Sequence, residues 1–306
     1  MRLGGQTVDA ARVRGASREA LFAVARFLHR LPYFRGRNRL FTITLRLAQR
    51  LGPPVVVEVD GFSVQLDLRD GLCRGVWAER AFPQGETLKA LCEPGDVVID
   101  VGANIGYMAL IAARAVGPGG RVVAIEPAPR SFALLEVNIA RNFPGRIIAV
   151  PTACDETDGI ATLFVSEYSD EHNSLRPEPV LGGAHKEVVP VRSLRSLCRE
   201  LHVTPDVVKI DVEGAEWRVL KGLLDDDARR PRTLLVEGYE PNARGFGYRP
   251  SAMCAWLRDR GYHLSLSRDS ERFGYSDMRA DGPLLHDVVA LQSERGERHQ
   301  PRPARA

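Results

Sequence analysis

A glycine-rich turn and a later glutamate have residue types and a spacing suited to ligand binding. The turn, GANIG at residues 102–106, follows the segment VVIDV, which is typical of a buried parallel strand, and Glu126 ends the next predicted strand. Glycine allows positive φ and a close approach of the backbone, and a carboxylate at a strand end can accept hydrogen bonds from both hydroxyls of a ribose. Ligands of open α/β sheets lie beyond the carboxyl ends of the strands, so we expect the turn and Glu126 to meet at one ligand.

The residues of the turn favour one class of adenosine-containing cofactor. A dinucleotide site reads G-x-G-x-x-G, and its second glycine makes room for a pyrophosphate. Here Asn104 occupies that position and the spacing is G-x-x-x-G. A polar side chain there suits a cofactor that lacks a pyrophosphate but carries an amino-acid part, such as S-adenosylmethionine (SAM). SAM is therefore the predicted cofactor, and a nicotinamide cofactor is the alternative that Asn104 and the missing third glycine disfavour.

Acidic residues follow a second predicted buried strand. In DVVKIDVEGAE, residues 206–216, the apolar part ends at Asp211, and Glu213 and Glu216 follow. A carboxylate at the end of a central strand beside a cofactor can take the proton of a substrate hydroxyl, so Asp211 is the predicted base and Glu213 the second candidate. For Glu216 we favour a structural role at a helix N-terminus. Mg²⁺ held by several of these acids is a weaker hypothesis, and no metal ligand is assigned, because neighbours in sequence do not make a coordination sphere.

The elements that position these residues alternate between strands and helices, which is the pattern of a doubly wound α/β sheet. We expect parallel strands at residues 97–101, 121–125, 147–150, 207–212 and 233–237, and a final antiparallel pair at 262–266 and 286–291. Helices are expected after Gly106, after Pro129, and at residues 194–201, 216–224 and 250–260. Residues 54–68 alternate around Asp60-Gly61, which predicts a hairpin.

Four regions are predicted along the chain. Residues 1–53 form a basic helical extension in which residues 1–16 are disordered, Ser17 caps a helix that Pro32 ends, and a second helix spans residues 40–51. Residues 54–92 hold the hairpin and a lead-in helix. Residues 93–292 form the main domain, with an excursion at residues 155–190 that contains one strand, residues 160–165, and a polar substrate loop. Residues 293–306 are a disordered tail.

Charge is distributed unevenly between the extension and the rest of the chain. Residues 1–51 contain eleven arginines against Asp9 and Glu19, which gives +9, whereas the whole chain carries +3 and the remainder therefore −6. The overall charge does not call for a nucleic-acid partner. One interpretation of residues 17–51 is a basic amphipathic segment on anionic lipid or on a partner. The other, which we favour, is a helical appendage that packs on the core with its arginines in solvent.

Cysteine spacing and hydropathy predict the compartment. The cysteines occur singly, without metal or redox spacing, so free thiols in a reducing compartment are expected at Cys73, Cys92, Cys154, Cys198 and Cys254. The longest apolar run falls well short of the ~18 residues that a membrane span needs. Charged residues interrupt the N-terminus where a secretory signal would be apolar. We predict a cytoplasmic protein, peripheral at the inner membrane face if the N-terminal helices bind lipid.

Two longer segments resemble the FkbM family of SAM-dependent methyltransferases. They contain ETLKALCEPGDVVIDVGANIGYMALIAARAVGPGGRVVAIEPAP and VPVRSLRSLCRELHVTPDVVKIDVEGAEWRVLKGL. The DVGANIGY core, the EPxP after the second strand and KIDVEGAE are each close to the pattern of the family. The resemblance extends from about residue 79 to residue 262, so residues 1–53 and the tail lie outside it.

The resemblance implies a class I methyltransferase fold with the strand order 3-2-1-4-5-7-6. It implies SAM above the glycine turn, with Glu126 on the ribose hydroxyls. It also implies that Asp155 contacts the adenine, and the equal alternative is that Asp155 is only a turn residue. The implied cofactor-binding residues are Asp100, Gly102, Ala103, Asn104, Gly106, Tyr107, Glu126 and Asp155. The segment His172-Asn173-Ser174 lies where the family often has a polar motif, which implies a substrate loop or a solvated loop.

The resemblance further implies an O-methyltransferase acting on hydroxyls of sugars or secondary metabolites. Such an acceptor loses its proton as its oxygen attacks the methyl group, so a base near the oxygen helps. His172 and His286 are candidates after Asp211 and Glu213, although a lone histidine is more often structural. The alternatives are a nicotinamide-dependent oxidoreductase and a non-catalytic SAM-binding protein. The acceptor remains open between a small-molecule and a glycan or glycolipid hydroxyl, and no oligomeric state is predicted.

Overall fold

A seven-stranded sheet is the centre of the computed structural model, which describes residues 10–80, 85–166, 173–176, 184–224, 230–266 and 288–292. The sheet order is β5-β4-β3-β9-β10-β12-β11. The strands are β3 (Val97–Val101), β4 (Arg121–Ile125), β5 (Ile147–Val150), β9 (Val207–Ile210), β10 (Thr233–Val236), β11 (Tyr262–Leu266) and β12 (Val288–Gln292). Neighbours from β5 to β10 are parallel, whereas β12 is antiparallel to β10 and β11. Numbered along the chain this is 3-2-1-4-5-7-6, so the predicted fold class is confirmed.

Helices cover both faces of the sheet, and the residues of each central strand alternate between two cores. In β3, Val98 belongs to one apolar cluster and Ile99 and Val101 belong to the other. Successive strand residues point to opposite faces, and both faces are buried, which explains the continuous apolar run. One face is covered by α4 (Glu86–Leu91), α5 (Tyr107–Val116) and α6 (Pro129–Asn142), and the other by α7 (Leu194–Glu200), α8 (Glu216–Leu224) and α10 (Pro250–Asp259).

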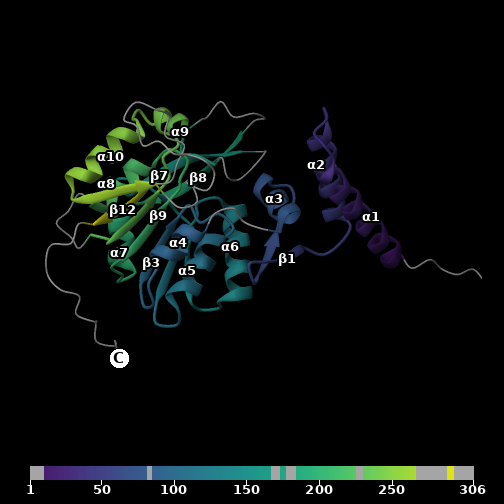
Figure 1. The fold of residues 1–306 in the computed structure, drawn as a ribbon, viewed down its shortest axis with the longest axis horizontal. Coiled ribbons are helices and arrows are strands. Elements are labelled where there is room, and N and C mark those ends of the chain that lie inside the picture. The colour runs from purple at the N-terminus through teal and green to yellow at the C-terminus, as the bar shows by residue number, and fades with distance from the viewer. Residues whose placement is uncertain are drawn as a thin grey trace, which may run out of the picture.

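A helical hairpin and a β-hairpin precede the sheet. They comprise α1 (Ala10–Arg30), α2 (Arg37–Arg50), β1 (Val55–Val59) and β2 (Phe62–Leu66), and α3 (Gly71–Glu79) follows. The predicted β-hairpin is confirmed, because β1 and β2 pair around Asp60 and Gly61. The amide of Gln65 donates to Asn138 Oδ1 on α6 at 2.7 Å, which fixes the β-hairpin to the sheet domain. The α1–α2 hairpin lies at one end of the molecule, with α3 between it and the sheet (Figure 1).

The first helix corrects the predicted disorder of residues 1–16. Residues 10–16 are helical, because α1 begins at Ala10, and residues 1–9 lie outside the described residues. Ser17 is therefore an exposed residue within α1 and not its N-cap. Alanine and arginine, which dominate this segment, both have high helix propensity and let the helix extend upstream. The second helix also starts earlier than predicted, at Arg37.

The excursion at residues 155–190 contributes to a small second sheet. Its strands are β6 (Ala153–Cys154), β7 (Gly159–Ser166) and β8 (Ala184–Arg192), in the order β6-β8-β7. The sequence predicted β7 and missed β8, whose apolar residues are interrupted by Lys186, Glu187 and Pro190. Phe164 and Ser174 exchange backbone hydrogen bonds of 2.8 and 3.1 Å, so residues 173–176 lie beside β7. The rest of the predicted substrate loop lies outside the described residues.

The structure confirms some of the remaining predictions from the sequence and corrects others. The predicted strand 207–212 ends at Ile210, so Asp211 begins the following turn. The last strand starts at Val288 in the described chain, and His286 and the tail after Gln292 lie outside it. The five cysteines are free thiols, as predicted. Among the described residues, we find no helix with the length and apolar character of a membrane span.

Candidate functional site

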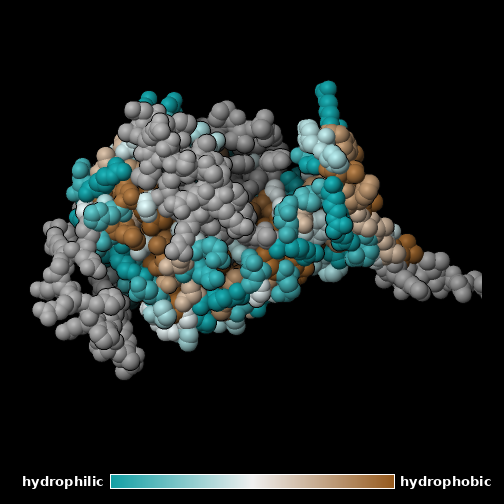
Figure 2. Space-filling view, viewed as in Figure 1, coloured by the Kyte–Doolittle hydropathy of each residue, from teal (hydrophilic) through white to brown (hydrophobic). Residues whose placement is uncertain are grey.

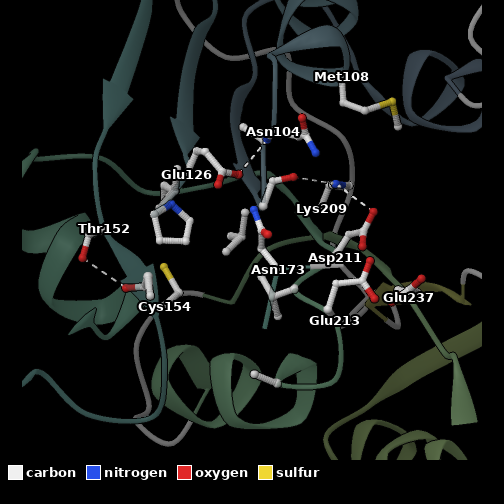
Figure 3. A pocket seen from close by; sticks show the side chains of 18 of the residues that line it. Asn104, Met108, Glu126, Thr152, Cys154, Asn173, Lys209, Asp211, Glu213 and Glu237 are labelled. Carbon is white, nitrogen blue, oxygen red and sulfur yellow. Dashed lines mark hydrogen bonds and ion pairs between the residues drawn. The ribbon is translucent and has the colours of Figure 1, made fainter. Parts of the chain in front are cut away.

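A cavity of about 250 Å³ opens at the carboxyl ends of β3, β4, β9 and β10 (Figure 3). One water needs only ~10–15 Å³ of such space, so the cavity is large enough for an organic ligand. Its walls come from the turns after these strands and from β6 and β7. The predicted site residues that line it are Gly102, Ala103, Asn104, Tyr107, Glu126, Asp211 and Glu213; Lys209, Glu237 and Asn173 join them.

The glycine turn brings the two halves of the cavity wall together. Gly102 has φ +76°, and a Cβ added to it would collide with the carbonyl oxygen of Asp211. Only glycine therefore allows the turn after β3 to lie against the turn after β9. Gly106 has φ +93°, and its added Cβ would lie 2.6 Å from Leu135 Cδ1 on α6. Gly106 thus serves the packing of α6 and does not line the cavity.

Glu126 is held at the cavity wall by the backbone around it. Its Oε2 accepts a hydrogen bond of 2.9 Å from the amide of Asn104, and its Oε1 accepts one of 2.9 Å from the amide of Ala128. The side chain is buried, and Figure 3 shows it beside the glycine turn. These charge-assisted bonds orient the carboxylate before any ligand arrives. The predicted meeting of Glu126 with the turn is therefore present, whereas its contact with a ribose remains a prediction.

Two amide side chains present buried polar atoms at the cavity wall. Among the described residues, neither Asn104 Oδ1 nor Asn173 Nδ2 has a hydrogen-bond partner. Buried polar groups are nearly always satisfied, so such atoms at a cavity indicate a ligand or ordered water as the missing partner. Asn104 offers an acceptor and Asn173 a donor. Asn173 comes from the excursion, and its Oδ1 accepts from the amide of Ser166 at 3.0 Å.

A buried lysine that the sequence analysis did not single out organises the acidic side of the cavity. Lys209 Nζ lies 3.2 Å from Asp211 Oδ2 and 3.4 Å from Asp100 Oδ1, and it donates to the carbonyl of Gly102 at 3.3 Å. Burial raises the pKa of Asp100, the charge of Lys209 lowers it, and the charge of Asp211 raises it. The signal in the sequence was a lone lysine within the buried strand VVKI.

Three carboxylates gather on this side of the cavity (Figure 3). Asp211 is about one-third exposed, which gives it access to a ligand in the cavity. Glu213 has φ +55°, and its carboxylate accepts from the side-chain amide of Asn242. Ser174 Oγ donates to the backbone carbonyl of Glu213 at 3.0 Å, so the excursion is tied to this turn. Glu237 follows β10 and completes the group.

Three predicted site residues do not reach the cavity. Asp100 is fully buried beneath it, and Gly106 packs on α6. Asp155 instead pairs with Arg218 Nε at 2.6 Å and is not among the lining residues. The structural role favoured for Glu216 agrees with its contacts, because it is buried and accepts from the amides of Val212 and Gly214 at 3.1 and 2.8 Å.

Histidine and metal chemistry receive no support from the described part of the site. His172 and His286 lie outside the described residues, so their candidacy as bases is untested. In the described chain, no group of three or more His, Cys, Asp or Glu is arranged to hold a metal ion. The Mg²⁺ hypothesis is therefore not carried further.

Comparisons with known proteins identify similar methyltransferases. The family model described as "Methyltransferase FkbM domain" matches residues 100–264, which include the glycine turn, Glu126 and Asp211. Methyltransferase sdnD of Sordaria araneosa is 30% identical over 202 residues, which cover 56% of this chain and 75% of that protein. 31-O-demethyl-FK506 methyltransferase FkbM of Streptomyces tacrolimicus is 32% identical, with coverages of 58% and 76%. Hexuronic acid methyltransferase AglP of Haloferax volcanii is 29% identical, with coverages of 56% and 68%.

Proposed function

The chain belongs to the FkbM family of methyltransferases, and on this premise we propose that it transfers a methyl group from SAM to a hydroxyl oxygen of a sugar, glycan or secondary metabolite. One observation carries the proposal. A single cavity has the glycine turn and Glu126 on one side and the carboxylates of Asp211, Glu213 and Glu237 on the other. The first side suits a nucleoside, and the second suits a hydroxyl that must lose a proton.

The cofactor belongs on the side of the glycine turn. Glu126, already oriented by two backbone amides, would accept hydrogen bonds from the ribose hydroxyls. Asn104 Oδ1 supplies a buried acceptor for the amino group of the methionine part. Gly102 and Ala103 allow the ligand to approach the backbone closely. When bound, SAM supplies an electrophilic methyl group.

The acceptor belongs on the side of the acids. Asp211 is the proposed base, and Lys209, 3.2 Å from its Oδ2, holds the carboxylate in place. With SAM bound, the acceptor oxygen would bond to the methyl carbon as the carbon–sulfur bond breaks and S-adenosylhomocysteine leaves, and the acceptor proton would pass to the Asp211 carboxylate. Placing the oxygen in line with the methyl group supplies much of the remaining rate. Glu213, whose carboxylate is held by Asn242, is the second candidate.

The names of two relatives support a hydroxyl-bearing acceptor. One relative is named for a demethylated FK506 and another for hexuronic acid. The buried donor Asn173 Nδ2 lies at the cavity wall and is the proposed polar contact to such an acceptor. We therefore propose a small-molecule or glycan partner and not a nucleic acid.

Calorimetry with SAM, S-adenosylhomocysteine and NADH tests the cofactor assignment. We expect the two sulfur nucleosides to bind and NADH not to bind. Glu126→Gln is expected to weaken SAM binding by about tenfold or more, because bonds to a charged acceptor contribute about 1.5–3 kcal/mol. Glu136→Gln, at an exposed carboxylate on α6, is the matched control and should bind normally. Failure of the unmodified protein to bind SAM, or binding of NADH, would refute the proposal.

Release of S-adenosylhomocysteine with a panel of sugars, glycolipids and polyketide alcohols tests the base. Asp211→Asn is expected to keep its affinity for SAM and to lose about 10²–10⁴-fold in turnover, the usual contribution of a general base. Turnover by Asp211→Asn equal to that of the unmodified protein would show that the base is another residue. Release of product with no panel member, alongside tight SAM binding, would favour a non-catalytic SAM-binding protein.

A further inference from the structure

The α1–α2 hairpin exposes apolar side chains that no other described element covers. Phe27 on α1 is 63% exposed, and Tyr33 in the connecting loop is 76% exposed. Another six apolar residues are 40–48% exposed, namely Val13, Val24, Phe34, Leu40, Ile43 and Leu47. Figure 2 shows apolar colouring along the outer edge of this hairpin. Contiguous exposed apolar surface of this kind marks an interaction site more often than scattered single residues do.

Apart from Tyr33 and Phe34 in the connecting loop, these residues form an outer stripe along each helix that is turned away from the face that packs inward. On α1, Phe22 and Ala25 are buried, and Phe22 stacks against Trp77 of α3 with ring centroids 5.3 Å apart. Val13, Val24 and Phe27 are spaced by eleven and three residues, which places them on the other side of the helix. On α2, Leu40, Ile43 and Leu47 follow the same i, i+3, i+7 spacing. The inner faces alone explain the docking of the hairpin, so the outer apolar stripe has another role.

Arginines border the outer apolar stripe. Residues 10–51 contain ten arginines and one acidic residue, Glu19. Within the described residues, Arg30, Arg39 and Arg50 are exposed and have no ion-pair partner. Each lies three or four positions from a member of the stripe, and such residues are neighbours on a helix surface. The occupant of this surface must therefore offer apolar groups and negative charge together.

We propose that the α1–α2 hairpin lies on the surface of an anionic lipid bilayer. Its outer apolar stripe and the loop aromatics enter the boundary between headgroups and acyl chains, and the bordering arginines contact lipid phosphates. The hairpin lies on the bilayer and does not cross it, because neither helix is long and apolar enough to span. A second copy of the chain is a poorer occupant, because it would bring two sets of arginines together. A nucleic acid would leave the apolar stripe in water.

Co-sedimentation of the full chain with vesicles tests the proposal. Vesicles of phosphatidylcholine with 30% phosphatidylglycerol are expected to carry the protein down, and vesicles of phosphatidylcholine alone are expected to carry much less. Raising the salt should weaken the binding, since charges at a surface are screened. No binding to the anionic vesicles would overturn the proposal, and so would equal binding to both vesicle types.

Two sets of substitutions separate the apolar and charged contributions. Val24→Ser with Phe27→Ser and Ile43→Ser removes part of the stripe, and Arg30→Gln with Arg39→Gln and Arg50→Gln removes its border. The arginine set is expected to weaken binding on the order of a hundredfold at low salt, and the serine set at least tenfold. All of these side chains are exposed, so the variants should unfold at the same temperature as the unmodified protein.

Matched substitutions elsewhere serve as controls. Ile160→Ser with Val188→Ser changes two apolar residues that are 78% and 77% exposed on β7 and β8. Arg121→Gln with Arg141→Gln and Arg258→Gln removes three exposed arginines outside the hairpin. Both control proteins should bind vesicles normally. Equal losses in the control and hairpin variants would overturn the proposal, as would a dimer in solution that the serine set dissociates, since the occupant would then be a second copy.

Discussion

At the residue scale, Gly102 is the position on which the cavity depends most. Its φ of +76° is close to the φ of +74° at Gly145. A Cβ added to Gly102 would collide with the carbonyl oxygen of Asp211, whereas a Cβ added to Gly145 would point into open space. Gly145→Ala should therefore cost only the strain of the backbone, about 1–2 kcal/mol. Gly102→Ala should cost more than about 3 kcal/mol, because the two turns must also separate. Urea unfolding measures both values, and equal costs would contradict this account.

The ion pair between Lys209 and Asp100 gives a second prediction. Lys209→Met leaves a fully buried carboxylate without its cation, so it should lower the free energy of unfolding by about 3–5 kcal/mol at pH 7. Burial already raises the pKa of Asp100 above its usual 3.8, and loss of the lysine raises this pKa further. The folded state then binds a proton that the unfolded state releases, so the stability of Lys209→Met falls as pH rises.

Urea unfolding at pH 5 and pH 7.5 measures this pH dependence. The double variant Asp100→Asn with Lys209→Met lacks the Asp100 carboxylate but keeps that of Asp211, so it is the control. We expect the single variant to recover part of its lost stability at pH 5, relative to the double variant. The same difference between the two variants at both pH values would show that Asp100 does not titrate in this way.

The sequence predicted some of the site residues and missed others for physical reasons. The glycine turn, Glu126 and Asp211 follow apolar strands, so their place at the sheet edge follows from the topology alone. Lys209 was missed because a lysine within a strand gives no indication of the face it occupies. Asp155 was placed in the adenine region only by resemblance, and its pairing with Arg218 on α8 depends on packing between distant segments.

At the element scale, strands buried on both faces were predicted well, whereas a half-exposed strand and the start of a surface helix were missed. β3 and β4 are buried on both faces, so apolar residues fill nearly all of their positions, with Asp100 in β3 and Arg121 at the start of β4 as exceptions. About half of the residues of β8 are exposed and one is a proline, and its pairing with β7 supplies the order that its sequence does not indicate. The start of α1 was missed because helix propensity is a weak signal where no apolar face begins.

Asp67, just after β2, is predicted to fasten the helical hairpin to the sheet domain. It accepts from Gln49 on α2 at 2.8 Å and from Arg130 on α6 at 2.9 Å, and it pairs with Arg69. Burial raises the pKa of Asp67, but the bonds from Arg69 and Gln49 and the charge of Arg130 outweigh it and hold the pKa well below its usual range. Asp67→Asn should therefore cost about 1.5–3 kcal/mol at pH 7.

The pH dependence of this cost distinguishes charge from packing. A carboxylate with a lowered pKa stabilises the fold above its unfolded pKa, and this contribution is lost as pH falls below that value toward the folded pKa. The difference in unfolding free energy between the unmodified protein and Asp67→Asn should therefore shrink from pH 7 to pH 3. Glu58→Gln, at an exposed carboxylate on β1, should show no such difference. A cost for Asp67→Asn that is equal at both pH values would assign the effect to packing.

At the scale of the whole molecule, the strand order explains why one site draws on the entire sheet domain. β3 lies between β4 and β9, so the connection after β3 runs to one side of the sheet and the later strands are added on the other side. A crevice forms at the carboxyl end of β3, between the two sides. The order was predicted because the resemblance supplied it, whereas alternation of strands and helices alone indicates only the fold class. The α1–α2 hairpin lies outside both the sheet and the family match, and its position depends on its contacts with α3 and, through Gln49, with Asp67.

Residues on both sides of the sheet line the cavity, so a ligand bound there should stabilise both sides equally. Cys73 on α3 and Cys254 on α10 are buried thiols on opposite sides, and burial raises the pKa of each, so each reacts only after its surroundings open. SAM at 100 times its Kd should slow labelling of both thiols by about a hundredfold. Mass spectrometry measures the two rates, and Glu126→Gln should reduce both effects together. Protection of only one thiol would mean that the sides open independently and that the ligand is held by one of them.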